Sequence, residues 1–277
     1  MSRVQEGEVG AGDRIGATFA RCRARGEAAL VTYVMAGDPD VAGSKAMAVA
    51  CAEGGADLVE LGIPFSDPIA DGPTIQAAAE RALAVGTTTR DVLAVAAHLR
   101  ARSEVPIALM GYLNPILSHG VETFARDCRK AGVDALIVPD LLPEEAGEIT
   151  PVLAGHGVRT VFHLAPTSGP ERIEAAAGAA SGFLYFVSVT GVTGARRSAP
   201  AEIGPMVAAI RARSPVPVVI GFGVSTPEQA RSLAPLADGV VVGSAIVQRI
   251  AKGGPRAARA ARVRRFVASL KRAIARK

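Results

Sequence analysis

Short runs of apolar, β-branched residues alternate with Ala-rich stretches of helical periodicity along most of the chain. Eight of the apolar runs are typical of strands, and a helical pattern separates each from the next. Their hydrophobicity is continuous rather than alternating, which indicates parallel strands buried on both faces. The expected strands span residues 30–35, 58–61, 107–110, 135–138, 160–164, 184–187, 216–220 and 239–242.

Eight such units in 277 residues predict an α/β fold, a (β/α)8 barrel of the TIM type, which commonly takes about 250 residues. A doubly wound open sheet is the alternative. It usually has fewer strands and a Gly-x-Gly-x-x-Gly fingerprint after the first one, where this chain has Ala-Gly-Asp-Pro at residues 36–39. Ile15, Phe19 and Cys22 predict an additional N-terminal helix that covers the barrel floor.

The ends of the chain differ from its body in composition. Residues 1–12 are Gly-rich, and we expect a disordered lead-in there rather than a secretory signal. Residues 13–277 show no composition break and are expected to form one domain. Residues 252–277 hold ten Lys or Arg and no acid, so the net charge of +5 leaves −5 for the rest. This distribution is a poor match to a nucleic-acid groove, which needs its positive charge on a folded face.

The basic segment also has an apolar stripe at helical spacing, which predicts a C-terminal helix docked on the domain. The stripe consists of Val263, Phe266, Val267, Leu270 and Ile274. A weak contact with a membrane surface or polyanion is the alternative. No apolar run in the chain reaches the roughly 18 residues of a membrane span.

Two acids stand at either end of a proline-stiffened loop. Glu60 lies in the second expected strand, where a carboxylate costs free energy unless it is hydrogen-bonded or takes part in chemistry. Asp71 follows after Pro64 and Pro68, and Pro73 then opens a helix. One carboxylate on a strand end and one on a loop are suited to proton transfer. The alternative is a buried structural acid and an aspartate that caps the helix.

Gly-rich turns follow the last three expected strands, at residues 191–194, 221–223 and 243–244. Glycine allows the backbone to approach an anion closely, and a helix N-terminus adds aligned N–H groups. Phosphate sites in such barrels usually lie after strands 7 and 8. The three turns together predict a phosphorylated substrate, held by Gly194, Gly223, Gly243 and Ser244.

Residues 59–76, VELGIPFSDPIADGPTIQ, closely resemble the strand 2 and loop 2 motif of the tryptophan synthase alpha chain family. Further segments are similar to other parts of that family, and together they cover about residues 19–250. These segments are residues 33–39, 109–115 (LMGYLNP), 138–141, 185–194 (YFVSVTGVTG), 221–223 and 243–244.

The resemblance implies a lyase that cleaves indole-3-glycerol phosphate into indole and glyceraldehyde 3-phosphate in L-tryptophan biosynthesis. Glu60 matches the family's catalytic glutamate, which would act as acid and base. Asp71 matches its catalytic aspartate, which would accept a hydrogen bond from the indole N–H. Tyr185 matches a tyrosine that positions the glycerol chain or Glu60. The remaining expected substrate contacts are Tyr33, Met110, Phe222 and Thr193.

The resemblance also implies a beta subunit as partner, in an alpha2beta2 tetramer, with pyridoxal phosphate bound in the beta subunit and no cofactor in this chain. Pro64 and Asp67 are our expected contact residues, on an exposed part of the loop at residues 64–73. Residues 190–199 are expected to form a mobile lid. The alternatives are a free-standing lyase, a sugar-phosphate isomerase and a non-catalytic ligand-binding regulatory subunit.

Histidine and cysteine residues give little support to other chemistry. His163 stands near the end of the fifth expected strand, where the resemblance predicts an aliphatic pocket residue, and we expect a hydrogen-bonded packing role for it. The cysteines are scattered without CxxC spacing, which favours a reducing cytoplasm over a disulfide framework. No cluster at metal-ligand spacing is present, so no metal is expected.

Overall fold

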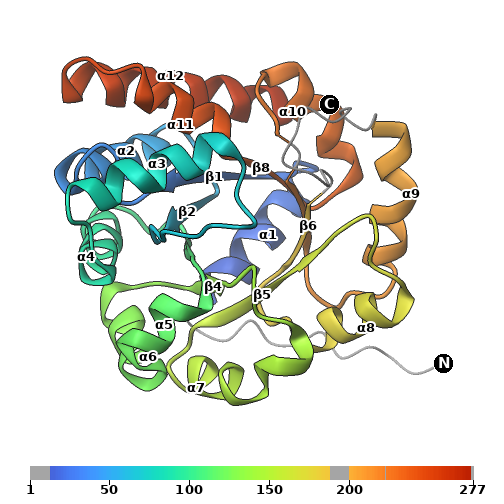
Figure 1. Cartoon of the computed structure of the whole chain (residues 1–277). Coiled ribbons are helices and arrows are strands. Elements are labelled where there is room, and N and C mark those ends of the chain that lie inside the picture. The colour runs from blue at the N-terminus through green and yellow to red at the C-terminus, as the bar shows by residue number, and fades with distance from the viewer. Residues whose placement is uncertain (1–12, 188–199, 222, 276–277) are drawn as a thin grey trace.

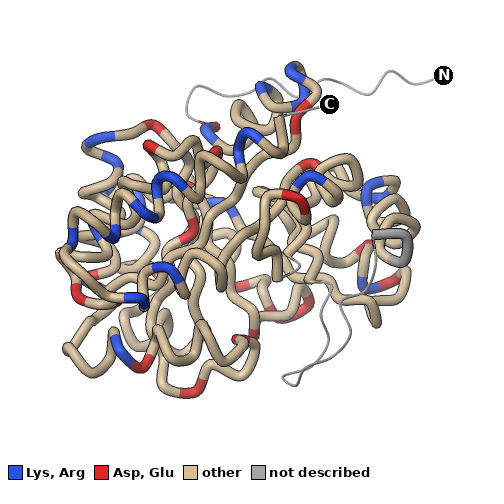
Figure 2. The backbone as a smooth tube through the Cα atoms, turned by 90° about the horizontal axis from the view of Figure 1, so that it is seen from above, with Lys and Arg blue, Asp and Glu red and all other residues tan. Residues whose placement is uncertain are grey.

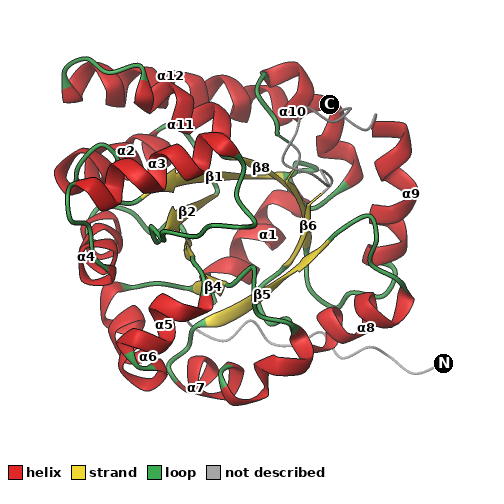
Figure 3. Cartoon of the chain, in the orientation of Figure 1, coloured by secondary structure: helices red, strands yellow, loops and turns green. Residues whose placement is uncertain are grey.

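The computed structural model describes residues 13–187, 200–221 and 223–275, and within them eight parallel strands close into a barrel (Figures 1 and 3). Each strand is hydrogen-bonded to the next, and β8 pairs with β1 to close the ring. The predicted TIM barrel is confirmed. The strands are β1 (Ala29–Met35), β2 (Leu58–Gly62), β3 (Ile107–Met110), β4 (Ala135–Ile137), β5 (Arg159–Leu164), β6 (Leu184–Val187), β7 (Val218–Gly221) and β8 (Gly239–Val242).

Three of the observed strands, β3, β6 and β8, have the expected bounds, and the other five differ from them by one or two residues at an end. The seventh strand begins at Val218 instead of Val216. The Val216 N–H donates to Ser214 Oγ within a turn, and Pro217 has no N–H for a strand ladder. The sequence pattern could not separate this apolar approach from the paired strand.

Helices occupy the connections and form an outer ring around the strands (Figure 3). Helix α3 begins at Pro73, as expected, and α10 begins with Pro227 in its first turn and a Thr226–Gln229 capping box. The described helices of the connections are α2 (Val41–Glu53), α3 (Pro73–Ala84), α4 (Thr89–Arg100), α5 (Leu113–His119), α6 (Val121–Ala131), η1 (Pro143–Glu148), α7 (Thr150–Gly155), α8 (Pro170–Ala179), α9 (Pro200–Arg211), α10 (Pro227–Leu233), η2 (Ala234–Leu236) and α11 (Ser244–Ala251).

Helix α1 (Arg14–Ala24) closes one end of the barrel, as predicted. Asp13 caps its N-terminus by accepting from the Gly16 N–H at 2.9 Å. Its Ile15, Phe19 and Cys22 are buried in one cluster with inward-facing residues of the strands. The Phe19 ring lies 5.9 Å from that of Phe183 on the strand side. Water is therefore excluded from this end, and a ligand must enter from the other.

The barrel interior changes character along the strands. The residues that pack above α1 are apolar, and they include Val31, Leu58, Val161 and Phe183. Because alternate residues of a strand face inward, the next inward position on each of these strands lies two residues further on. At that level, near the carboxyl ends of the strands, the inward residues are Tyr33, Glu60, Met110, His163 and Tyr185.

Helix α12 (Arg256–Ile274) lies against α2 and α10, and the five apolar residues of its predicted stripe are all buried. Figure 2 shows Lys and Arg positions along this helix. Some of this charge is paired with the body, because Lys271 Nζ lies 2.8 Å from Asp57 Oδ2 and 3.1 Å from Glu27 Oε2. The predicted docked terminal helix is confirmed. In the part of the chain that the structure describes, no helix has the length and apolarity to cross a membrane.

Candidate active site

A cavity of about 550 Å³ opens at the carboxyl ends of the strands. Its wall includes residues from β1, β2, β3, β5, β6 and β8 and from the loops that follow them. Eight of the site residues predicted from the sequence meet here: Tyr33, Glu60, Asp71, Met110, Tyr185, Gly223, Gly243 and Ser244. Phe222, Thr193 and Gly194, also predicted, lie outside the described residues, as do the expected lead-in at residues 1–12 and lid at residues 190–199.

Glu60 is held in the middle of β2, in register with Tyr33 of β1 and Ala108 of β3. Its exposed fraction is 0%, and within the described part of the chain neither carboxyl oxygen has a hydrogen-bond partner. Burial raises the pKa of Glu60 to about 8. The alternative of a structural acid is not supported, since a structural acid would be paired. At neutral pH the side chain is therefore mostly a protonated acid at the edge of the cavity.

Asp71 does not cap the helix that follows it. The N-cap of α3 is Gly72, and no side chain accepts a hydrogen bond there. Instead, Asp71 Oδ2 accepts a hydrogen bond from the Tyr112 hydroxyl at 3.2 Å. Burial raises the pKa of Asp71 to about 6, while the Tyr112 hydrogen bond lowers it. Asp71 is therefore mostly a carboxylate at neutral pH, and it lines the same cavity as Glu60, which is mostly protonated.

Tyr112 is the residue that sequence reasoning missed. It lies just after β3, accepts the Ala70 N–H at 3.0 Å, and stacks on Phe65 with ring centroids 5.2 Å apart. The segment LMGYLNP contains it, but nothing in that segment indicates contact with the loop 41 residues earlier. Gln76 Nε2 adds a hydrogen bond to the Asp71 carbonyl at 2.9 Å. Together these contacts hold the acid-bearing loop over the cavity.

Tyr33 and Tyr185 reach the cavity because glycines on neighbouring strands leave room for their rings. A Cβ at Gly221 would come within 2.7 Å of Tyr185 Oη, and one at Gly62 would clash with Tyr33 Oη. Burial, followed by the negative charges of Glu60 and Asp71, raises the pKa of both phenols well above the ordinary value. Both tyrosines thus remain neutral hydrogen-bond donors close to both acids.

The opposite corner of the cavity is formed by backbone and small side chains. Gly243 is the N-cap of α11 and Ser244 its first residue, so the N–H groups of the first helical turn lie at the cavity edge. Gly223, in the turn after β7, has φ of +57°, a conformation that favours glycine. Free N–H groups at a helix N-terminus, together with a hydroxyl, are suited to bind an anion such as phosphate.

In the loop at residues 64–73, one of the two predicted exposed contact residues is not exposed. Pro64 is buried, not exposed, because it directly continues the buried end of β2 through Ile63. Asp67 is exposed, as predicted, and Ile69 is 81% exposed although it is a large apolar residue. The outer part of this loop therefore starts after Phe65.

His163 lines the cavity on β5 and packs against Tyr185, with ring centroids 4.8 Å apart at an interplanar angle of 61°. The expected packing role is present, but the expected hydrogen bond is wrong: among described residues, neither ring nitrogen has a partner. No charged group acts on it, and burial lowers the pKa of His163 to about 4. The imidazole is therefore neutral at pH 7.

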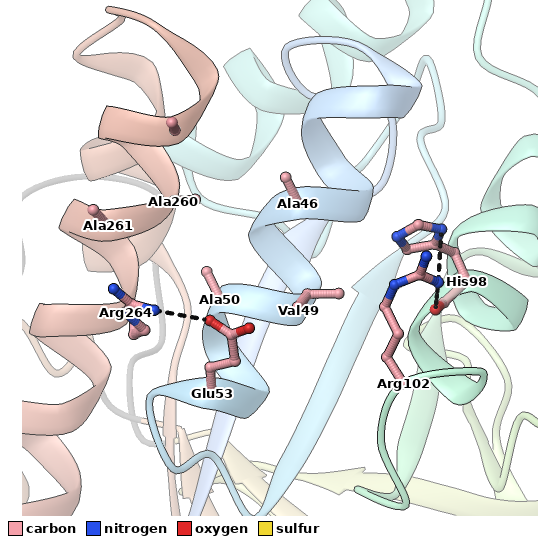
Figure 4. Close-up of a pocket in the computed structure, with 10 residues that line it drawn as sticks. Ala46, Val49, Ala50, Glu53, His98, Arg102, Ala260, Ala261 and Arg264 are labelled. Atoms are coloured by element: carbon pink, nitrogen blue, oxygen red, sulfur yellow. Dashed lines mark hydrogen bonds and ion pairs between the residues drawn. The ribbon is translucent and has the colours of Figure 1, made fainter.

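A second hollow of about 360 Å³ lies outside the barrel, between α2, α4 and α12 (Figure 4). Its floor is formed largely by alanines, including Ala46 and Ala260. The charged groups on its rim are paired with neighbours: Arg264 contacts Glu53 at 3.2 Å, and Arg102 contacts the His98 carbonyl at 3.0 Å. It is a groove between helices, and its one lining carboxylate, Glu53, is paired with Arg264. Among described residues, no group of three or more His, Cys, Asp or Glu is placed to hold a metal.

Comparisons with known proteins agree with this geometry. The family model described as tryptophan synthase alpha chain matches residues 19–275. The tryptophan synthase alpha chain of Geobacter sulfurreducens is 55% identical over 235 residues, which are 85% of this chain and 89% of the relative. A chain of tryptophan synthase from Mycobacterium tuberculosis superposes with a TM-score of 0.88 at 40% identity, over 96% of this chain and 100% of the other. The alpha subunit from Legionella pneumophila gives a TM-score of 0.86 at 37% identity, over 95% of this chain and 99% of that one.

Proposed function

The chain belongs to the tryptophan synthase alpha chain family, and we propose that it performs the retro-aldol cleavage of indole-3-glycerol phosphate to indole and glyceraldehyde 3-phosphate. The observation that carries the proposal is Glu60: a fully buried carboxyl group, without a hydrogen-bond partner among the described residues, on the wall of a cavity that also contains Asp71 and a helix N-terminus. A buried acid with a raised pKa and no structural partner is typical of a proton-transfer site.

The two acids divide the chemistry according to their protonation. Protonated Glu60 donates its proton to C3 of the indole, and the ring becomes a positively charged indolenine. The Asp71 carboxylate accepts a hydrogen bond from the indole N–H and stabilises that charge. Glu60, now a carboxylate, removes the proton of the glycerol hydroxyl next to the ring. The carbon–carbon bond breaks as the aldehyde forms, its electrons return to the ring, and Glu60 is protonated again.

The order of strands in the closed barrel supports one orientation of the substrate. We place the phosphate at Gly223, Gly243 and Ser244, after β7 and β8, with Gly194 as a further contact. In a ring of this order, β3 lies opposite β7 and β4 lies opposite β8. The indole ring would therefore extend away from the phosphate, toward Met110. The glycerol chain would then cross between β2 and β6, which present Glu60 and Tyr185 on opposite sides. Tyr185 would therefore position the glycerol chain.

The remaining substrate contacts extend these assignments. Tyr33, Met110 and Phe222 would line the flat apolar ring, and Thr193 would contact the substrate from the loop after β6. We assign no cofactor to this chain, and pyridoxal phosphate to the beta subunit. We propose that residues 13–277 act as one cytoplasmic domain.

We propose a beta subunit as the partner, docked over the cavity mouth in an alpha2beta2 tetramer. Exposed apolar side chains follow three neighbouring strands at this mouth: Ile69 after β2, Leu117 after β3 and Leu142 after β4. Asp67 lies on the same rim. Exposed apolar residues with a charged neighbour are typical of a protein interface, and Pro64 would support this rim from below.

The test is an assay of indole release from indole-3-glycerol phosphate, by the purified chain and by the chain with its beta subunit. Release by both, faster in the complex, is expected. Release that the beta subunit does not change would indicate a free-standing lyase. Binding of the substrate without any release of indole would indicate a regulatory subunit. Isomerisation of a sugar phosphate, in a separate assay, would indicate a sugar-phosphate isomerase.

A further inference from the structure

His163 occupies the same inward level of the barrel as the proposed catalytic groups. It pairs in register with Tyr185, and its ring packs edge-on against the Tyr185 ring at 4.8 Å. Neighbours in register on parallel strands face the same side of the sheet, so both side chains face the cavity. The edge contact fixes the orientation of the imidazole and leaves part of its surface open to the cavity.

The imidazole brings hydrogen-bonding capacity that no residue in the described part of the chain uses. A neutral imidazole has one donor and one acceptor, and among the described residues neither has a partner. Because burial lowers its pKa to about 4, the ring stays neutral in the range where the enzyme works. A ligand that covers the imidazole with apolar surface would leave these groups unpaired, which is unfavourable.

The position of β5 decides which part of the substrate His163 meets. β5 adjoins β4, and β4 lies opposite β8. The proposed phosphate site includes Gly243 and Ser244, directly after β8. The cavity wall on that far side includes Met110, Pro139 and His163. A substrate anchored by its phosphate at Gly243 and Ser244 therefore points the benzene half of its indole toward His163.

We propose that His163 is a specificity-determining residue, which hydrogen-bonds a polar substituent such as a hydroxyl on the benzene half of the indole. The proposal rests on the function proposed above and deepens it. It extends the substrate class from indole-3-glycerol phosphate to derivatives hydroxylated on the benzene ring. An aliphatic residue at this position would favour the unsubstituted ring instead, because it leaves no polar group unpaired.

The experiment measures dissociation constants of indole-3-propanol phosphate, which lacks the glycerol hydroxyls and cannot be cleaved, and of its four derivatives hydroxylated on the benzene ring. The proteins are the wild type, His163→Leu and His163→Asn. The preference for a derivative is the dissociation constant of the parent compound divided by that of the derivative. For at least one hydroxyl position, we expect this ratio to be at least 10-fold larger in the wild type than in His163→Leu. His163→Asn should keep part of that preference, since an amide also donates and accepts.

His98→Leu is the matched control, because His98 lies outside the barrel in the groove of Figure 4 and should leave the preference unchanged. Equal hydroxyl-to-parent ratios in the wild type and His163→Leu at every position would overturn the inference and leave the proposed function standing. If His163→Leu does not fold, the same comparison with His163→Val decides, because valine also has no donor or acceptor in its side chain. Failure of the folded wild type to bind any of the five compounds would overturn the proposed function itself, and the inference with it.

Discussion

The Tyr112 hydroxyl donates a hydrogen bond to Asp71 Oδ2 at 3.2 Å and accepts one from the Ala70 N–H at 3.0 Å. A residue at the end of β3 thereby holds the loop that follows β2. Asp71 is otherwise carried by a loop, so its distance from the substrate depends on this contact. We propose that Tyr112 is a positioning residue, which acts on the substrate through Asp71.

Tyr112→Phe should lower kcat about 10-fold, because the loop loses the hydrogen bonds that hold Asp71 in place, and one loosely held group typically costs that much or more. It should also raise the pKa of Asp71, since the hydrogen bond from Tyr112 lowers that pKa. The pH profile of kcat/KM distinguishes this from a general loss of structure. An acidic limb that stays in place in the variant would contradict the positioning role.

Glu60→Gln should retain the fold and lower cleavage by about 10²–10⁴, because the amide has a similar shape but cannot carry the proton. Asp71→Asn should cost less, since the amide oxygen can still accept the indole N–H. Single-turnover rates give the comparison, with thermal unfolding as the check on folding. Wild-type turnover in Glu60→Gln would mean that the carboxyl is structural.

Activity should follow a bell-shaped pH profile, because the proposed roles need opposite protonation states. Asp71 must be ionised, so kcat/KM should rise with pH through about 6, where its pKa lies. Glu60 must be protonated, so kcat/KM should fall as pH rises through about 8. Asp71→Asn should lose the acidic limb and keep the alkaline one. A profile that is flat from pH 5 to 9 would refute both assignments.

The sequence predicted the barrel because each strand is a continuous apolar run, a pattern set by burial on both faces. It predicted Glu60 and Asp71 because they belong to one unbroken segment. It missed Tyr112 because the contact with Asp71 spans 41 residues and depends on how two loops meet. Pro64 was misplaced because a proline-rich loop does not indicate where the chain leaves the core. Whether His163 has a hydrogen-bond partner among the described residues likewise depends on neighbours from other strands.

Gly223→Val should raise KM by about 10-fold or more, because a β-branched side chain is strained at φ of +57° and would keep the backbone away from the phosphate. Gly253→Val is the matched control: Gly253 has φ of +71° and lies between α11 and α12, away from the cavity wall. Crystals soaked in sulfate should show the anion at Gly243 and Ser244. An anion bound only elsewhere would remove the basis for a phosphorylated substrate.

The last prediction concerns coupling to the beta subunit. The loop that holds Asp71 is tied to Tyr112, but its outer residues are exposed, so a partner that binds this rim can favour one loop position. A partner that prefers the productive position raises activity by increasing its population. Asp67→Ala and Leu117→Ser should therefore reduce the gain in cleavage on adding beta subunit, while the isolated chain keeps its activity. Leu117 is 52% exposed and lies outside the cavity wall.

Val85→Ser is the matched control for Leu117→Ser, because Val85 is 55% exposed but follows the C-terminus of α3, two residues before Thr87, which packs against Gly37 in the turn after β1. Titrating the beta subunit against each variant separates weaker binding, which more beta subunit restores, from weaker coupling, which it does not. Since Asp67 lies on the loop itself and Leu117 on α5, Asp67→Ala should lower the gain even at saturation, whereas Leu117→Ser should mainly weaken binding. If both variants show the full wild-type gain at every concentration, the partner docks elsewhere, and the coupling does not run through this rim.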